Sequence, residues 1–241
     1  MSLPAGEPAA GSWQAVRTSE LMQLVATASS VPSGRPRVLA VDGRGGSGKS
    51  TLAERLRREA TRSALLHTDD LAWHEPLFGW GHLLVLVLKP LHRGEPVRFQ
   101  PPAWAQHGRQ GAIEVPGGLD LVIVDGTGAS QREVAQLMDA AIWVQADFAE
   151  AERRGIERDV AEGVNGDREQ AIAFWRDWMA AEMRFLDEQR PWERADVIVA
   201  GTPTIPLDAD EWAVAWPPLQ TSPAAVVNYG LSDGVVIHDK S

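Results

Sequence analysis

The chain of 241 residues contains no cysteine, which excludes disulfides, thiolate catalysis and metal sites built from thiolates. It is also short of positive charge, because 23 Lys and Arg residues stand against 33 Asp and Glu residues and give a formal net charge of −10. Such a chain has no general attraction for phosphate backbones or for anionic lipid surfaces. We therefore expect neither a nucleic-acid partner nor a membrane partner.

Long hydrophobic runs are absent as well. The longest apolar stretch, residues 83–88, is far too short to span a bilayer. The N-terminal residues do not combine a basic start with an apolar run, as a secretory signal would. A cytoplasmic location is the resulting expectation.

The remaining composition, with 44% hydrophobic and 23% charged residues, is typical of a folded globular protein. A chain of this length can bury one sizeable core. Short apolar runs of strand length alternate with segments of helical periodicity, and these runs cover residues 38–41, 64–66, 121–124, 141–144 and 197–200. This alternation predicts an α/β fold with a mainly parallel sheet and helices on both faces.

Three segments have the periodicity of helices. They cover residues 13–29, 147–162 and 167–189. The second begins at the capping residue Asp147, and the third opens with Asp167 and Gln170 in the spacing of a capping box. The third also carries an apolar stripe, formed by Ile172, Trp175, Met179, Met183 and Leu186.

The whole chain, 1–241, is expected to form a single domain. Residues 1–12 should be loose, and 13–36 should form a leading helix and linker. Residues 71–118, rich in Pro, Gly, Trp and His, are too long for a simple connection and should form a substrate-binding insertion. Before this insertion, residues 37–70 should contain the phosphate loop and an acceptor-side Asp pair. After it, residues 119–216 should contain the second half of the sheet and a lid, and residues 217–241 should form a tail.

The decisive motif is GRGGSGKS, which begins at Gly43 and fits the pattern G-x-x-x-x-G-K-[ST]. A hydrophobic strand enters the motif and a helix leaves it, so backbone amides and the positive helix end converge on one point. This arrangement predicts a site for the phosphate chain of ATP, in which Lys49 reaches the β- and γ-phosphates and the Ser50 hydroxyl binds Mg²⁺. The residues expected around the nucleotide are Gly43, Arg44, Gly45, Gly46, Ser47, Gly48, Lys49, Ser50 and Thr51.

Carboxylates follow two other predicted strands. Asp125 ends the run at 121–124 and should hold the Mg²⁺ shell beside the phosphate loop, although it could simply begin a turn. Asp69 and Asp70 follow the run at 64–66. Asp69 is the candidate general base and metal ligand, and Asp70 is either a residue of the metal shell or an orienting neighbour toward the acceptor. Which of the two is the base stays open, and a solvated turn is the alternative for both.

Two further groups of side chains complete the expected site. The insertion contains aromatic and imidazole groups that could line an acceptor pocket or pack in the core. These groups are Trp73, His74, Trp80 and Trp104. Arginines of the segment 147–162 could neutralise the transferred phosphoryl group from a closing lid or form a solvated face, and they are Arg153, Arg154 and Arg158. We expect Arg154 and Arg158, one turn apart, to act in catalysis.

Taken in order, these motifs resemble the uridine kinase-like P-loop kinases, the group that includes phosphoribulokinase and pantothenate kinase. The resemblance covers roughly residues 37–200, and the matching segments are VDGRGGSGKSTLAERL, HTDDLAW, LLVLVLKPLHRGEPVRFQPPAW, LVIVDGTGA and ERRGIERDVAEG. It implies a five-stranded parallel sheet, ATP as donor, Mg²⁺, Asp69 as base and lid arginines around the phosphates. Leu71 and Ala72 replace the family's aromatic pair, and residues 163–166 replace its Arg-Gly-Arg, so kinase chemistry is implied more firmly than uridine as acceptor.

These observations favour a kinase that transfers the γ-phosphoryl group of ATP to a hydroxyl of a nucleoside-like or other small metabolite. The alternative is a nucleotide-binding regulatory NTPase, a switch without a small-molecule acceptor. The insertion and the Asp69-Asp70 pair favour the kinase, because a switch needs only a water molecule. The sequence leaves a homodimer open.

Overall fold

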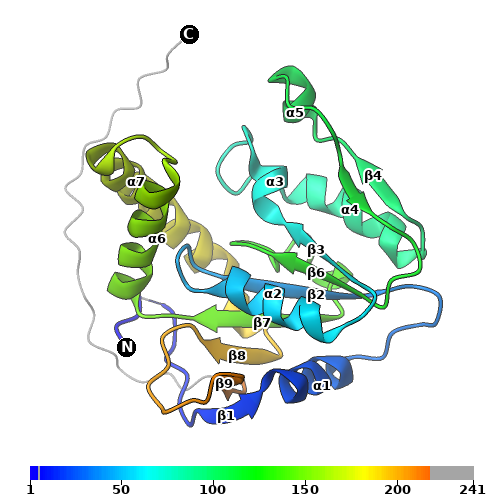
Figure 1. Ribbon diagram of the computed structural model, residues 1–241, viewed down its shortest axis with the longest axis horizontal. Coiled ribbons are helices and arrows are strands. Elements are labelled where there is room, and N and C mark those ends of the chain that lie inside the picture. Colours follow the sequence, from blue (N-terminus) through cyan, green and yellow to red (C-terminus); the bar gives the residue numbers. More distant parts are fainter. Residues whose placement is uncertain (5, 218–241) are drawn as a thin grey trace.

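A seven-stranded sheet forms the centre of the computed structural model, which describes residues 1–4 and 6–217 (Figure 1). Across the sheet the strands follow the order β1 (Gln14–Arg17), β9 (Glu211–Ala215), β8 (Val197–Ala200), β7 (Ala140–Gln145), β2 (Arg37–Gly43), β6 (Leu121–Asp125) and β3 (Ser63–His67). Strands β8 to β3 are mutually parallel, which confirms the predicted α/β class. The predicted tail lies, apart from residue 217, outside the described residues.

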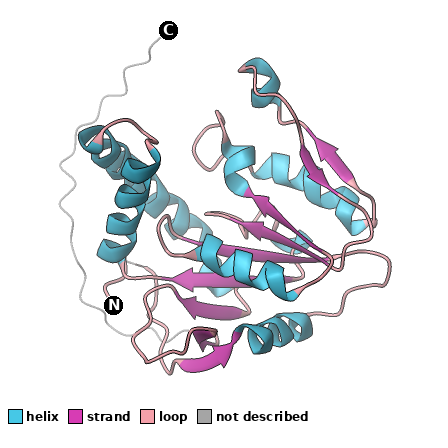
Figure 2. Ribbon diagram, viewed as in Figure 1, coloured by secondary structure: helices cyan, strands magenta, loops and turns pink. Residues whose placement is uncertain are grey.

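Helices cover both faces of the sheet, as Figure 2 shows. On one face, α1 (Thr18–Ala28) and α2 (Lys49–Glu59) pack on side chains such as Leu39 and Val41 of β2. On the other face, α4 (Gly81–His92) packs on Val38 and Ala40. Consecutive residues of β2 point to opposite faces, so a strand covered on both sides reads as an unbroken apolar run.

The helices of the second half also lie where their sequence patterns predicted. Helix α6 (Phe148–Glu162) is capped by Asp147, whose side chain accepts from the Glu150 amide, and the capping box of Asp167 and Gln170 is present at the start of α7 (Arg168–Gln189). A 3-10 turn, η2 (Pro191–Glu193), follows α7 and puts Trp192 against Trp143 of β7. Both helix starts are therefore fixed by local side-chain bonds.

The insertion after β3 contains α3 (Thr68–Ala72), α4, β4 (Val97–Phe99), α5 (Pro102–Gln106) and β5 (Ile113–Val115). Strands β4 and β5 pair antiparallel as a separate two-stranded sheet. A 3-10 turn, η1 (Ala135–Leu137), lies between β6 and β7. In Figure 1 the insertion lies at one side of the carboxyl-terminal edge of the sheet, and α6 and α7 lie at the other.

The prediction of a helix over 13–29 is wrong for its first turn. Residues Gln14–Arg17 form strand β1, which pairs antiparallel with β9, and α1 begins only at Thr18. Strand β9 was not predicted either. The pairing joins positions about 200 residues apart, from Gln14 opposite Val214 to Arg17 opposite Glu211, so the periodicity of either segment alone could not indicate it.

The expectation that residues 1–12 are loose is also wrong for those of them that the structure describes. The Ser2 amide donates to Asp147 Oδ2 at 2.6 Å, and the Ser2 carbonyl accepts from the Phe148 amide at 2.9 Å. Further along, the Ala10 amide donates to Gln145 Oε1 at 2.9 Å. These bonds hold the described N-terminal residues against the end of β7 and the start of α6. Among all described residues, no helix is long and apolar enough to cross a membrane.

Candidate active site

The phosphate-loop motif joins β2 to α2. Gly46 and Gly48 have φ values of 74° and 93°, and a Cβ at Gly46 would lie 1.9 Å from the Ala151 carbonyl oxygen. Glycine is therefore required at position 46 by both conformation and space. Lys49 begins α2 and donates from Nζ to the Arg44 carbonyl at 3.2 Å, and Ser50 next to it is exposed.

Asp42, the residue before the motif, fixes the loop from behind. Its buried carboxylate accepts from the amides of Gly43, Gly128 and Ser130 at 2.8, 2.8 and 2.9 Å, and from the Ser130 hydroxyl at 2.7 Å. Burial raises the pKa of Asp42, and these four bonds oppose that rise. The bonds tie the phosphate loop to the segment after β6, a role that the sequence did not reveal.

A second buried carboxylate reaches the loop from α7. Glu182 accepts from the Gly45 amide at 2.7 Å and from the Arg44 guanidinium at 3.2 Å, and both charged side chains are at most 2% exposed. Nearby, the Thr127 hydroxyl donates to the Gly43 carbonyl at 3.0 Å. The side chain of Arg44, expected near the nucleotide, is thus engaged in a buried ion pair with α7.

Asp125 ends β6 at the carboxyl edge of the sheet, beside the phosphate loop. Parallel pairing sets it opposite Val41 of β2 and His67 of β3. The side chain is buried; Oδ2 bonds His67 Nδ1 at 3.1 Å, while no partner is present for Oδ1 among the described residues. The bond to Asp125 raises the pKa of His67. His67 was not among the predicted site residues, although it stands at a strand end two positions before the predicted Asp pair.

A cavity of about 350 Å³ opens above this edge. It brings together Lys49, Asp69 and Arg158, which were predicted from three separate segments. One wall is mainly apolar and comes from the insertion and from α7, with Trp73, Phe174, Trp175 and Trp178. A cation from the loop, a carboxylate from α3 and an arginine from α6 therefore share one space with an aromatic wall.

Trp175 fixes α7 against both α6 and the phosphate loop. Its indole Nε1 donates to the buried carboxylate of Asp159 at 2.7 Å, and the same carboxylate accepts from Asn165 at 3.0 Å and Arg158 at 2.9 Å. A Cβ at Gly155 would lie 2.0 Å from the Trp175 ring, and one at Gly45 would lie 3.0 Å from it. The predicted apolar stripe of this helix included Trp175, but nothing in the spacing indicated its contact with the loop.

Several other predicted residues lie outside the lining of this cavity. Asp70 forms an ion pair with Arg109, which also stacks on Trp104 with its guanidinium carbon 3.6 Å from the ring centroid. Trp104 and Trp80 are buried in the core, and the Trp104 indole donates to the Asp70 carbonyl at 2.8 Å. For these two tryptophans the alternative of core packing applies.

The remaining predicted side chains have partners of their own. His74 stacks on His107 with ring centroids 3.9 Å apart. Arg153 pairs with Glu150 and Glu157 at the surface of α6. Arg154 donates to Glu150 at 2.8 Å and to the Gly201 carbonyl at 2.9 Å. Of the three predicted arginines, only Arg158 lines the cavity.

The predicted metal ligands Ser50, Asp69 and Asp125 do not form a complete metal site by themselves. Within residues 1–4 and 6–217, no group of three or more His, Asp or Glu side chains could hold a metal ion. A cation here would need further ligands, such as water or the oxygens of a bound phosphate chain.

Comparison with known proteins gives its clearest result at the level of structure. No family model matches the sequence, and no curated protein matches it. A D-glycerate 3-kinase from Cryptococcus neoformans var. grubii superimposes with a TM-score of 0.52 at 14% identity, over 81% of this chain and 98% of that one. The fold is that of the P-loop kinases.

Two further solved structures match the chain at low sequence identity. A candidate fructose transport system kinase from Silicibacter sp. gives a TM-score of 0.50 at 20% identity, over 70% of this chain and 95% of that one. A protein described as a possible uridine kinase from Bacillus stearothermophilus gives 0.48 at 17% identity, over 76% and 96%. The resemblance read from the motifs is confirmed as a P-loop kinase fold, with two antiparallel strands added to the five parallel ones.

Proposed function

We propose that this protein is a phosphotransferase that passes the γ-phosphoryl group of ATP to a hydroxyl group of a small molecule, with Mg²⁺. The observation that carries the proposal is the cavity shared by Lys49, Asp69 and Arg158. A phosphate loop alone would serve any NTPase, but a carboxylate that lines the same cavity as the loop lysine suits an acceptor hydroxyl. One solved structure of this fold is named a D-glycerate 3-kinase and another a candidate fructose transport system kinase, and both names contain a small hydroxylated metabolite.

Each polar group has a role in this proposal. The Asp69 carboxylate takes the proton of the acceptor hydroxyl as its oxygen bonds to the γ-phosphorus, while the bond from that phosphorus to the β,γ-bridging oxygen breaks and ADP leaves. Lys49 binds the β- and γ-phosphate oxygens, and Arg158 neutralises the charge of the group in transit. The aromatic wall excludes water and binds the body of the acceptor.

The residues present are suited to binding Mg²⁺ jointly with the phosphate groups of the nucleotide. Asp125 has one buried carboxylate oxygen without a partner among the described residues, an arrangement that is costly unless a donor, water or cation meets it. Asp125 and the Ser50 hydroxyl would hold the ion together with phosphate oxygens, and Asp69 is a further candidate ligand. The bound ion supplies charge neutralisation at the phosphates.

The test is ADP release measured against a panel of nucleosides, sugars, hydroxy acids and vitamins. A kinase should accelerate by at least about 10²-fold with the right acceptor, and the phosphorylated product should be detected by mass spectrometry. A switch would release ADP at the same slow rate with every compound. Constant slow release with a folded, nucleotide-bound protein would contradict the kinase proposal and favour the regulatory NTPase.

A further inference from the structure

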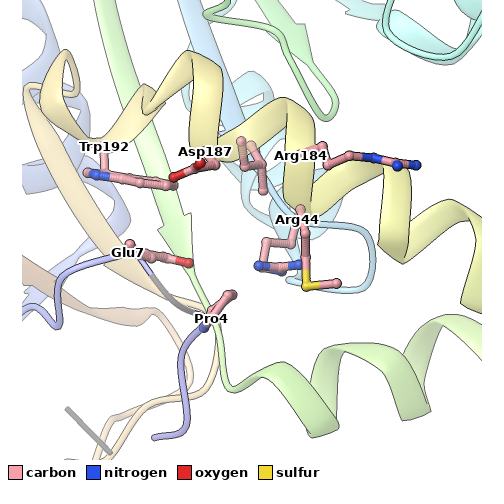
Figure 3. Close-up of a pocket in the computed structure, with 9 residues that line it drawn as sticks. Pro4, Glu7, Arg44, Arg184, Asp187 and Trp192 are labelled. Carbon is pink, nitrogen blue, oxygen red and sulfur yellow. The ribbon is translucent and has the colours of Figure 1, made fainter. Parts of the chain in front are cut away.

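A second cavity, also about 350 Å³, lies against the phosphate loop and shares no lining residue with the first (Figure 3). The N-terminal residues Pro4 and Glu7 form one wall, Arg44 of the loop forms another, and Met183 and Leu186 of α7 complete it with Trp192. Four of the eight side chains that line the cavity are apolar, and the other four are charged. The proposed phosphoryl transfer makes no use of this space.

Two polar atoms of the residues that line this cavity, Glu7 Oε2 and Trp192 Nε1, have no hydrogen-bond partner among the described residues. The Glu7 side chain is 5% exposed, and its Oε1 accepts from Trp143 Nε1 at 2.8 Å and from Gln145 Nε2 at 3.1 Å. No hydrogen-bond partner is present for Oε2, which is fully buried, among the described residues. A buried carboxylate oxygen left without a donor costs free energy, so this atom marks a place where a donor group would be stabilised.

The charges around Glu7 indicate which charge the donor group should carry. Arg44 is the nearby cation, and Figure 3 shows its guanidinium and the Glu7 carboxylate facing each other. The same guanidinium already binds Glu182 at 3.2 Å, so one buried cation serves two buried carboxylates. Asp187 and Arg184 also line the cavity, but both are exposed, and Arg184 extends away from Glu7. Among the buried groups, two carboxylates stand against one guanidinium, so the buried end of the cavity has an excess of negative charge.

Protonation offers one way to remove this excess. Burial raises the pKa of the Glu7 carboxyl, while Arg44 and the bonds from Trp143 and Gln145 oppose the rise. A ligand that brings its own positive charge and its own N–H donors would relieve the same imbalance and also fill the apolar space.

We propose that this cavity binds a small, largely apolar molecule that carries a protonated amine. The ammonium group donates to Glu7 Oε2, and the apolar body packs on Met183, Leu186 and Trp192. Because Arg44 belongs both to this cavity and to the phosphate loop, occupancy changes the affinity for nucleotide, and nucleotide changes the affinity for the amine by the same factor. The site is separate from the proposed acceptor cavity and does not depend on the reaction there.

The experiment titrates benzylammonium chloride, benzyl alcohol and sodium benzoate, three probes of similar size, into ¹⁵N-labelled protein and follows the Trp192 indole N–H signal. Trp192→Phe identifies that signal among the ten tryptophans. Benzylammonium should give a saturable shift with a Kd at least about tenfold lower than benzyl alcohol, and benzoate should give none. No saturation by benzylammonium at about 10 mM, or equal binding of amine and alcohol, would overturn the proposal.

Three variants show whether Glu7 is responsible. Glu7→Gln keeps an acceptor for Trp143 and should lose the tenfold preference for the amine, while benzyl alcohol binds as before. Glu188→Gln removes the same charge from an exposed position of α7 outside the cavity and should behave as the parent. Met183→Trp should fill the cavity and abolish binding of every probe. If Glu7→Gln retains the preference, Glu7 is simply a protonated core acid and the proposal fails.

Repeating the titration in saturating Mg²⁺ and ADP separates this cavity from the acceptor cavity. The amine affinity should change by a limited factor and then stay constant as ADP rises. Continuous weakening with rising ADP would mean that the amine occupies the nucleotide site, which would overturn the proposal. The titration requires no turnover, so a protein without kinase activity still gives a decisive answer here.

Discussion

The two edges of the parallel sheet carry the same kinds of charged residue in opposite states. At the amino-terminal edge, Asp139 precedes β7 and receives two bonds from the Arg35 guanidinium, at 2.7 and 2.8 Å, and one from the Val38 amide at 2.8 Å. Asp196 precedes β8 and accepts from the Ala141 amide at 2.8 Å. Both carboxylates fix the starts of strands, and Asp139 uses both of its oxygens to do so.

At the carboxyl-terminal edge the charged groups are held in place without being fully neutralised. Asp125 has one oxygen without a partner among the described residues, and Asp69 and Lys49 face a cavity. In an open α/β sheet, ligands bind outside the carboxyl ends of the strands. Position along the strand therefore matters, but it is not sufficient, because Asp42 also lies at the carboxyl end of a strand and has four hydrogen-bond donors. A carboxylate at this edge is a candidate functional group when it keeps an oxygen without a partner or faces the cavity. Substitutions at the two edges should therefore separate activity from stability.

The largest effect is expected for Lys49→Ala. Removing the cation from the phosphate cradle should lower kcat by about 10³-fold or more and leave the free energy of unfolding almost unchanged. Steady-state ADP release and urea unfolding measure the two quantities. Lys89→Ala, at an exposed position of α4, is the matched control and should resemble the parent. Turnover within tenfold of the parent would mean that the loop lysine is not used.

The second effect is expected for Asp69→Asn. Loss of the proton acceptor should lower kcat by roughly 10²- to 10³-fold, while the affinity for ATP changes little because the phosphate loop is intact. Isothermal titration with ATP and single-turnover kinetics test the two statements. Asp70→Asn, whose parent residue pairs with Arg109, should lose far less activity. A larger loss in Asp70→Asn would move the role of base to that residue.

At the other edge, Asp139→Ala should reverse the pattern. It leaves the mostly buried Arg35 unpaired and the Val38 amide without an acceptor, so the free energy of unfolding should fall by about 2–4 kcal/mol at unchanged kcat. Urea denaturation measures the loss. Asp120→Ala breaks the exposed pair with Arg62 and should cost less than about 1 kcal/mol. A comparable loss of unfolding free energy in both variants would show that burial of the ion pair does not determine its contribution to stability.

The smallest effect is the pH dependence of that same pair. Burial alone would raise the pKa of Asp139, but the bonds from Arg35 and Val38 outweigh it and lower the pKa. The pKa of Asp in an unfolded chain is about 3.9. The stabilisation that ionised Asp139 contributes is therefore complete above that pH and is lost as the pH falls through the lower pKa of Asp139 in the folded protein. The stability gap between parent and Asp139→Ala should stay constant from about pH 5 to 8 and narrow below about pH 4. A gap that widens in acid would contradict this.

Local patterns predicted the parts of the fold that local forces decide. The five parallel strands, the phosphate loop and the starts of α6 and α7 follow from apolar runs, glycine spacing and capping residues within a few positions of each other. Strands β1 and β9 escaped prediction because each depends on a partner about 200 residues away, and β1 is in addition largely exposed.

The candidate site divides in the same way. The residue types at Lys49, Asp69 and Asp125 could be selected because strand ends and a glycine-rich motif marked them. The preference for Arg158 over Arg154 could not be predicted from the sequence, because both lie on α6 and only their contacts with distant parts of the chain differ. Glu182 was missed because a charged residue within a helix is expected to face solvent. Its actual partners lie 137 and 138 positions earlier in the chain, where no local pattern connects them to Glu182.

The bond between Glu182 and the phosphate loop has a consequence for motion. Because the chain supplies its own carboxylate to the Gly45 amide and the Arg44 guanidinium, this part of the loop is ordered during folding, and nucleotide binding does not bear that cost. Withdrawing α7 from the loop would leave two opposite charges buried and separated, which is highly unfavourable. Helix α7 and the phosphate loop should therefore travel together as one rigid unit, and any opening of the cavity should occur through the insertion on its other side.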